Sequence, residues 1–206
     1  MPSFERSVFL NYPYDKSFEP LLYAIVLTIV SRGFIPRSAR EDEGQAELRM
    51  TRIARGLMTS KYSIHDLSRY RADAPNQLPR FNMPLELGMA VGLYYERRRL
   101  TQPNAPRDDE PNWLALVPKN HVHQKYISDL AGFDLGPYDS VWSVIVAVAA
   151  WLVQQPDFRK PSPTANTIHK AYPSYRGLVD KLRKDEGRLT WPMIVDSAVA
   201  IAATLV

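Results

Sequence analysis

The chain has 206 residues, 45% of them hydrophobic, and a formal net charge of +4 at pH 7. This length predicts one globular domain, or one domain with an appendage. Cysteine is absent, which excludes disulfides, thiolate nucleophiles and thiolate-bound zinc and fits a reducing, cytoplasmic location. Basic residues are scattered among almost as many acidic ones, so the charge gives little support for a nucleic-acid partner.

Strand-like apolar runs alternate with helical segments along most of the chain. Residues 1–6 lead directly into the first strand without the apolar stretch of a signal peptide, so we expect no export by that route. Pro36 cannot donate to a sheet ladder, which favours an edge position for the second strand. Asn82 is expected to cap a helix that has Pro84 in its first turn. Strands are expected at residues 7–11, 34–39, 61–67, 113–118 and near 133–135, and helices at residues 18–31, 47–59, 82–99, 124–131 and 140–154.

This alternation predicts an α/β domain with a doubly wound, mainly parallel sheet of about five strands. Ligands of such sheets bind outside the carboxyl ends of the strands. The first and third strands and the helix that starts at residue 82 should meet there. We therefore expect Asn11, Asp66 and Glu86 to converge on one cleft.

The C-terminal part is predicted to be a helical extension, at residues 174–206. Four prolines between residues 156 and 173 indicate a linker after the domain of residues 1–155, and helices are expected at residues 174–186 and 191–205. The last helix is apolar on most of its surface and must be buried, yet it is too short for a membrane span of roughly 20 residues. It either folds back on its own domain or packs against a second copy; we favour the second copy, and so a homo-oligomer.

Glu86 is the central candidate for chemistry. One turn into its helix, its carboxylate should stay ionised at neutral pH and could stabilise or capture a developing cation. Position alone is explained as well by an acidic residue that only complements the helix dipole. The neighbours Met83, Leu85, Leu87 and Met89 leave little polar surface, so Glu86 is expected to be paired or functional.

Other polar side chains follow the predicted strands. Asp66 could orient a ribose hydroxyl or a general base, although ordinary turn chemistry explains it equally well. His65 is expected to face the other side of the sheet as a satisfied structural histidine. The substrate-binding candidates are Asn11, Tyr12, Tyr14, Asp15, Arg40, Ser68, Arg69 and Asn82. Packed tyrosine rings and a solvated charged loop are the alternatives for the tyrosines and Arg40.

Two other classes of site find little support. His121 and His123 lie two residues apart without a third ligand nearby in the sequence, so no metal site is expected. A Gly-x-Ser-x-Gly elbow is also absent, which argues against a serine hydrolase.

Three segments resemble a known family. They are VFLNYPYD at residues 8–15, YSIHDLS at residues 62–68 and RFNMPLELG at residues 80–88. Together they are similar to a bacterial TIR-like family related to the nucleoside 2-deoxyribosyltransferases, over about residues 7–153. The NMPLELG block matches the helix on which both superfamilies place a catalytic glutamate.

The resemblance implies a flavodoxin-like fold and cleavage of the N-glycosidic bond of NAD, a nucleotide or a nucleoside, in the manner of a toxic effector of antiphage defence. It implies that Glu86 is the catalytic carboxylate, that Asp66 is its neighbour and that Asn11 and Tyr12 belong to the pocket. NAD or the nucleotide would be the substrate, with no cofactor and no metal. The alternative, from another class, is a nucleotide-sensing or scaffold module without turnover.

Overall fold

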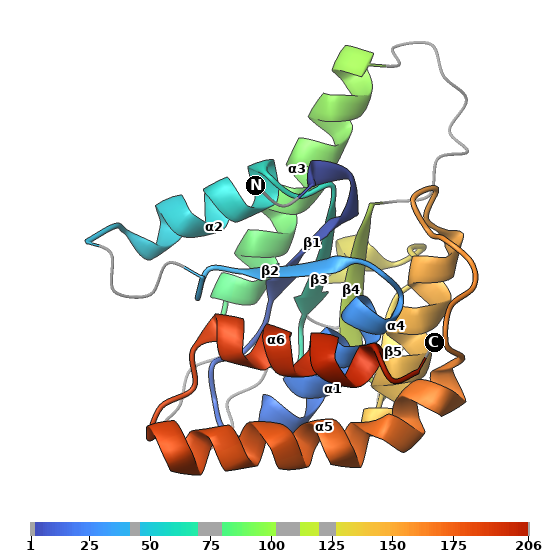
Figure 1. The fold of residues 1–206 in the computed structure, drawn as a ribbon. Helices are drawn as coiled ribbons and strands as arrows, with labels where there is room; N and C mark the ends of the chain where they lie inside the picture. Colours follow the sequence, from blue (N-terminus) through green and yellow to red (C-terminus); the bar gives the residue numbers. More distant parts are fainter. Residues whose placement is uncertain (1–2, 42–45, 70–79, 102–111, 120–126, 206) are drawn as a thin grey trace.

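The fold is built on a five-stranded, all-parallel sheet with the strand order β2-β1-β3-β4-β5 (Figure 1). The computed structural model describes residues 3–41, 46–69, 80–101, 112–119 and 127–205. The strands are β1 (Ser7–Asn11), β2 (Ile35–Ser38), β3 (Tyr62–Asp66), β4 (Trp113–Pro118) and β5 (Gly136–Tyr138). This topology confirms the predicted flavodoxin-like α/β fold. Pro36 lies in β2 at the edge of the sheet, as its missing N–H predicts.

Helices cover both faces of the sheet. Helices α2 (Arg49–Met58) and α3 (Asn82–Thr101) pack on one face, and α1 (Glu19–Ser31) and α4 (Val141–Gln154) pack on the other. The side chains of β1 show why both faces are apolar: Phe9 packs with the α2 and α3 residues, whereas Val8 and Leu10 pack with α1 and α4.

The C-terminal helices α5 (Ala165–Glu186) and α6 (Trp191–Ala202) pack on α1 of the same chain (Figure 1). The Tyr172 hydroxyl donates to the Pro20 carbonyl at 3.0 Å, and Arg183 pairs with Glu19 at 2.8 Å. Helix α1 therefore lies between the sheet and a further helical layer, which explains its apolar residues on nearly every side. Folding back, the less favoured alternative for the last helix, is the arrangement observed.

Three element boundaries differ from the sequence prediction. Helix α5 begins at Ala165, so residues 165–173 are helical rather than linker. Thr164 caps the helix start, and Pro173 lies on its exposed side, where water can satisfy the carbonyl that proline leaves without a donor. The fifth strand begins at Gly136 rather than Phe133, at a point where a Cβ would lie 2.8 Å from Leu116 Cδ2. In place of a helix over 124–131, the described residues form one 3-10 turn, Ser128–Leu130, and 120–126 lie outside the described residues.

Candidate functional site

Asn11, the last residue of β1, connects the sheet to α3. Its Nδ2 lies 3.1 Å from His65 Nδ1 on β3 and donates to the Met83 carbonyl at 3.3 Å. Its Oδ1 is buried and has no hydrogen-bond partner among the described residues. Asn11 thus places the first turn of α3 against the carboxyl ends of β1 and β3, where a ligand of a parallel sheet is expected.

His65 is buried, as expected of a structural histidine. Its Nε2 lies 2.9 Å from Ser63 Oγ, so both ring nitrogens have partners. Burial lowers the pKa of His65 to about 3. The imidazole is therefore neutral and fixes the amide of Asn11.

Glu86 is buried on α3, with 3% of its surface exposed. Burial raises its pKa to about 7, and the charge of Arg49 opposes that rise. The expectation of a fully ionised carboxylate at neutral pH is therefore wrong. Helix α3 begins at Asn82, and its first turn contains no acidic residue, so Glu86 lies beyond the amides that would favour its charge.

Arg49, the first residue of α2, is the cation nearest to this carboxylate. Its Nη2 lies 3.6 Å from Glu86 Oε1, and its guanidinium lies 4.7 Å from the centroid of the Tyr14 ring. Burial raises the pKa of Tyr14, Arg49 lowers it and Glu86 raises it further. Tyr14, Arg49 and Glu86 therefore form one electrostatic group, which we call the Glu86 group.

Tyr12 is packed rather than open. Only 3% of its surface is exposed, and its ring lies between those of Phe18, at 6.2 Å, and Trp191, at 6.3 Å. Tyr14, with 46% of its surface exposed, is the tyrosine of this segment that can reach a ligand. Of these two rings, Tyr14 is the one available for stacking.

The candidate Arg40 is held by the C-terminal extension. Its Nη2 donates to the Leu189 carbonyl at 3.1 Å, and its backbone N–H donates to Ser38 Oγ at 3.2 Å. Because Trp191, the first residue of α6, lies beside Tyr12, the start of α6 and the turn before it touch both the β1 end and the β2 end of the candidate site.

The Asp66 carboxylate is occupied by hydrogen bonds on the face of the sheet that α1 and α4 cover, not on the face of α2 and α3. It accepts from the Tyr138 hydroxyl at 2.6 Å and from the backbone N–H of Ser68 at 2.9 Å, and it also accepts from the Ser68 hydroxyl. Burial raises the pKa of Asp66, and these hydrogen bonds lower it. No hydrogen bond or ion pair joins the two described carboxylates Asp66 and Glu86. Asn11 therefore contacts the start of α3, the helix of Glu86, whereas Asp66 binds Tyr138 and Ser68 instead.

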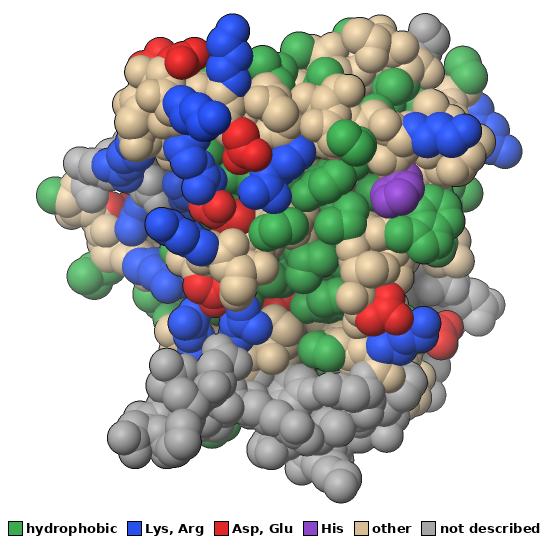
Figure 2. Space-filling view, turned by 90° about the horizontal axis from the view of Figure 1, so that it is seen from below, with side chains coloured by type: hydrophobic (Ala, Val, Ile, Leu, Met, Phe, Trp, Pro, Cys, Tyr) green, Lys and Arg blue, Asp and Glu red, His purple; other side chains and the backbone are tan. Residues whose placement is uncertain are grey.

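Asp15, Arg69 and Arg80 form an ion-pair cluster on the face onto which the strand ends open. Arg69 Nη2 lies 2.8 Å from Asp15 Oδ1, and Arg80 Nη1 lies 3.4 Å from Asp15 Oδ2. Hydrogen bonds from Arg69 hold the pKa of Asp15 down at about 2. Lys and Arg side chains gather on one side of this face (blue, left in Figure 2). Asn82, the first residue of α3, is exposed.

Arg49, Ser38 and Tyr138 are the residues of this region that sequence reasoning missed. Arg49 stands in a helix-forming segment with no motif around it, and its link to Glu86 exists only because α2 and α3 pack side by side. Tyr138 belongs to the strand whose position was misplaced. No signal within the sequence pairs these residues with their partners.

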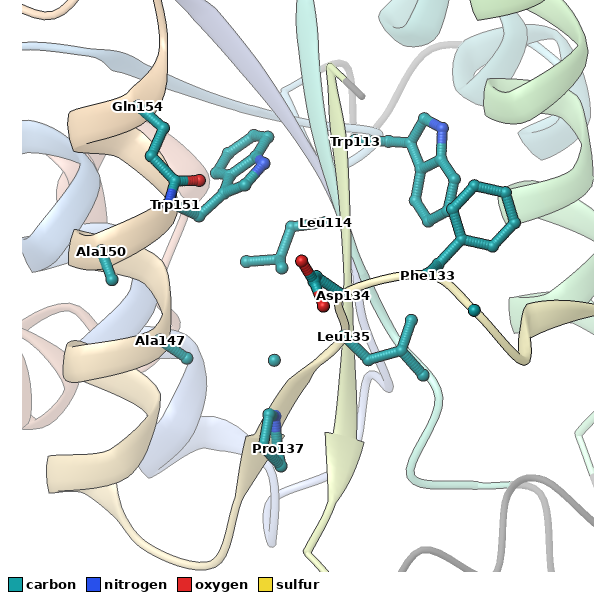
Figure 3. Close-up of a pocket in the computed structure, with 12 residues that line it drawn as sticks. Trp113, Leu114, Phe133, Asp134, Leu135, Pro137, Ala147, Ala150, Trp151 and Gln154 are labelled. Atoms are coloured by element: carbon teal, nitrogen blue, oxygen red, sulfur yellow. The ribbon is translucent and has the colours of Figure 1, made fainter. Parts of the chain in front are cut away.

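A cavity of about 320 Å³ lies at another place, between α4 and the β4–β5 edge of the sheet. Figure 3 shows Trp151 and Gln154 on the α4 side and Phe133 and Leu135 on the other. None of the predicted site residues lines this cavity. The candidate chemistry therefore lies with the Glu86 group.

A scan of protein-family models and a search of curated proteins both found no match to this chain. Among the helices of the described segments, none combines the length and the apolarity that a membrane crossing requires. Within the same segments, no three His, Asp or Glu side chains gather into a metal site, and His121 and His123 lie outside them.

Proposed function

We propose that this chain is an N-glycosidase-type enzyme that cleaves the bond between base and ribose in NAD, a nucleotide or a nucleoside. The observation that carries the proposal is the Glu86 group: one buried carboxylate with a pKa of about 7, an arginine 3.6 Å away and a half-exposed tyrosine ring beside them. A carboxylate with a strongly shifted pKa at the carboxyl edge of a parallel sheet marks a candidate active site.

In the proposed reaction the N-glycosidic bond breaks and its electron pair leaves with the base. Positive charge then develops on the anomeric carbon of the ribose, and the Glu86 carboxylate stabilises or captures that carbon until water adds to it. Arg49 favours the ionised form of Glu86, which is the form that this step needs. Tyr14 offers a ring on which a base can stack.

The resemblance in the sequence extends the proposal to a toxic effector of antiphage defence, because cleavage of NAD deprives a cell of an essential cofactor. It also motivates the homo-oligomer, since enzymes of the resembled family often act as assemblies. A fold-back of α5 and α6 leaves other surfaces free for such contacts.

The second candidate is a nucleotide-sensing or scaffold module without turnover. The state of Asp66 favours it, because three donors from Tyr138 and Ser68 already occupy this carboxylate. A site in which Asp66 is already hydrogen-bonded and Glu86 pairs with Arg49 can bind a nucleotide without a second group to activate water.

The test is to incubate the purified full chain with NAD and with a panel of nucleosides and nucleotides, and to follow the free base by chromatography. Glu86→Gln should lower base release by roughly a hundredfold or more. Glu96→Gln, on the exposed part of the same helix, is the matched control and should keep full activity. Tight binding without base release would establish the sensing module instead, and release that survives Glu86→Gln would overturn the catalytic assignment.

A further inference from the structure

A second cavity, of about 340 Å³, lies at the amino ends of β1 and β2, whereas the Glu86 group lies at the carboxyl ends of the strands. Its polar wall is formed by Arg6, Ser31, Arg32, Arg159 and Ser162, and its apolar wall by valine, proline and alanine side chains. Arg6 directly precedes β1 and Arg32 ends α1, while the end of α6 closes another side. None of the described residues that line it is acidic.

The polar groups of this cavity are incompletely satisfied. Arg6 Nε, Arg32 Nε and Ser31 Oγ are buried and have no hydrogen-bond partner among the described residues. Ser31 has only 8% of its surface exposed. Buried polar atoms normally have partners, so three such atoms on side chains that line one cavity make this a polar site that a ligand with hydrogen-bonding groups would suit.

Arg32 has no carboxylate partner among the described residues. Burial lowers the pKa of Arg32, and no carboxylate offsets this effect. The guanidinium of Arg32 lies 5.8 Å from the Phe158 ring centroid and donates to Ser162 Oγ at 3.0 Å, so its described partners are neutral. A partly buried cation without a counter-ion is unfavourable, and a bound anion removes that penalty.

Neutralisation of the helix dipole would be a simpler role for an arginine that ends α1. That role does not explain the arrangement, because the Arg32 guanidinium donates to Ser162 instead of the last carbonyls of its helix. It also does not explain why Arg6 and Arg159 come to the same cavity from two other segments. Gly33, which has a φ of 77°, turns the chain after α1 beside Arg6 Nη2.

We propose that this cavity binds a small phosphate-bearing anion, with the phosphate held by Arg6, Arg32 and Arg159. Guanidinium groups match phosphate oxygens in charge and in geometry. The volume is near the lower end of ligand pockets, which suits pyrophosphate or a nucleoside monophosphate better than a dinucleotide.

This site is independent of the Glu86 group. Arg6 and Asn11 stand at opposite ends of β1, about 17 Å apart for five extended residues. The cavity joins four parts of the chain: the segment before β1, the end of α1, the connection from α4 to α5, and the end of α6. An anion bound there would therefore hold the C-terminal layer to the sheet domain.

The test uses the full chain with sodium pyrophosphate as the probe, measured by calorimetry and by ³¹P NMR at constant ionic strength. Arg32→Gln and Arg159→Gln should each weaken binding roughly tenfold to a hundredfold, the effect of one charge-assisted hydrogen bond. Lys160→Gln, which removes an exposed charge next to Arg159 but lies outside the lining, is the matched control and should change binding less than about twofold.

Adenosine monophosphate should compete with pyrophosphate, and Glu96→Gln, an exposed change on α3, should bind pyrophosphate as the unaltered chain does. Arg159 is exposed, so Arg159→Gln keeps the test valid even if Arg32→Gln does not fold. An absence of pyrophosphate binding in the millimolar range would overturn the proposal. Equal losses in Arg159→Gln and Lys160→Gln would overturn it as well, because they would show a diffuse charge effect.

Discussion

Arg49 Nη2 lies 3.6 Å from Glu86 Oε1, and this ion pair joins the start of α2 to α3. The two partners differ in exposure: 42% of the Arg49 side chain is exposed, against 4% for Glu86. Burial therefore acts mainly on the carboxylate, and the ionisation of Glu86 depends on an arginine that solvent or a ligand can reach.

Replacing Arg49 by alanine should raise the pKa of Glu86 further above about 7, because Arg49 is the group that opposes the effect of burial. A ¹³C NMR titration of the Glu86 side-chain carboxyl measures the change directly. Arg99→Ala, which removes an exposed arginine paired with Glu96, serves as the control and should leave Glu86 unchanged. An unchanged pKa in Arg49→Ala would show that the ion pair is not formed in solution.

Glu86→Gln should make stability less dependent on pH. The pKa of Glu86 rises from about 4.5 in the unfolded chain to about 7 in the fold, so the fold favours the protonated acid. The stability that this group contributes is present below about pH 4.5 and is lost as pH rises through about 7, with a total of roughly 3 kcal/mol. Urea unfolding at about pH 5 and about pH 8 should therefore show a smaller fall for Glu86→Gln than for the unaltered chain. Equal falls would mean that Glu86 is solvated in the folded protein.

His65 should remain neutral well into the acid range. Its pKa is lowered to about 3 by burial, so the unfolded chain takes up a proton below about pH 6.5 and the folded chain does not. Stability from this group is thus lost as pH falls from about 6.5 towards 3, by up to about 1.4 kcal/mol per pH unit. ¹⁵N NMR at about pH 5 should show a neutral ring with its proton on Nε2, because Nδ1 faces the Asn11 amide. An imidazolium at that pH would contradict the buried placement.

The doubly wound parallel sheet followed from the sequence because alternation of strands and helices leaves few topologies, and Pro36 favoured an edge position for the second strand. The sequence did not predict which face of α3 is buried. Leu85, Met89 and Leu93 recur at helical spacing, yet Leu85 is 56% exposed and the buried positions include Met83 and Leu87. A helix with apolar residues on several sides offers more than one possible stripe, and only packing against β3 and β4 decides between them.

Only those parts of the candidate site that depend on correctly predicted strands could be predicted from the sequence. Asn11 could be placed near the start of α3 because it ends a strand that had been identified correctly. Arg49 could not, since its contact depends on how α2 lies beside α3. The start of α5 was predicted too late because the four prolines of residues 156–173 indicated a linker, whereas Pro173 lies on the solvent side of the helix.

Trp191 should connect the C-terminal layer to the candidate site. Its indole has 3% of its surface exposed and lies 6.3 Å from the Tyr12 ring, with the two planes 21° apart. Trp191→Ala should lower the free energy of unfolding by about 3–5 kcal/mol, because it leaves a cavity beside α1, while Trp191→Phe should recover much of that loss. Trp142→Ala is the matched control, since 42% of Trp142 is exposed, and it should cost much less. Chemical denaturation followed by circular dichroism gives these values.

If Trp191→Ala and Trp142→Ala lower the free energy of unfolding by the same small amount, α6 is not packed on the domain as described. That result would restore a second copy of the chain as the partner for the apolar surface of α6.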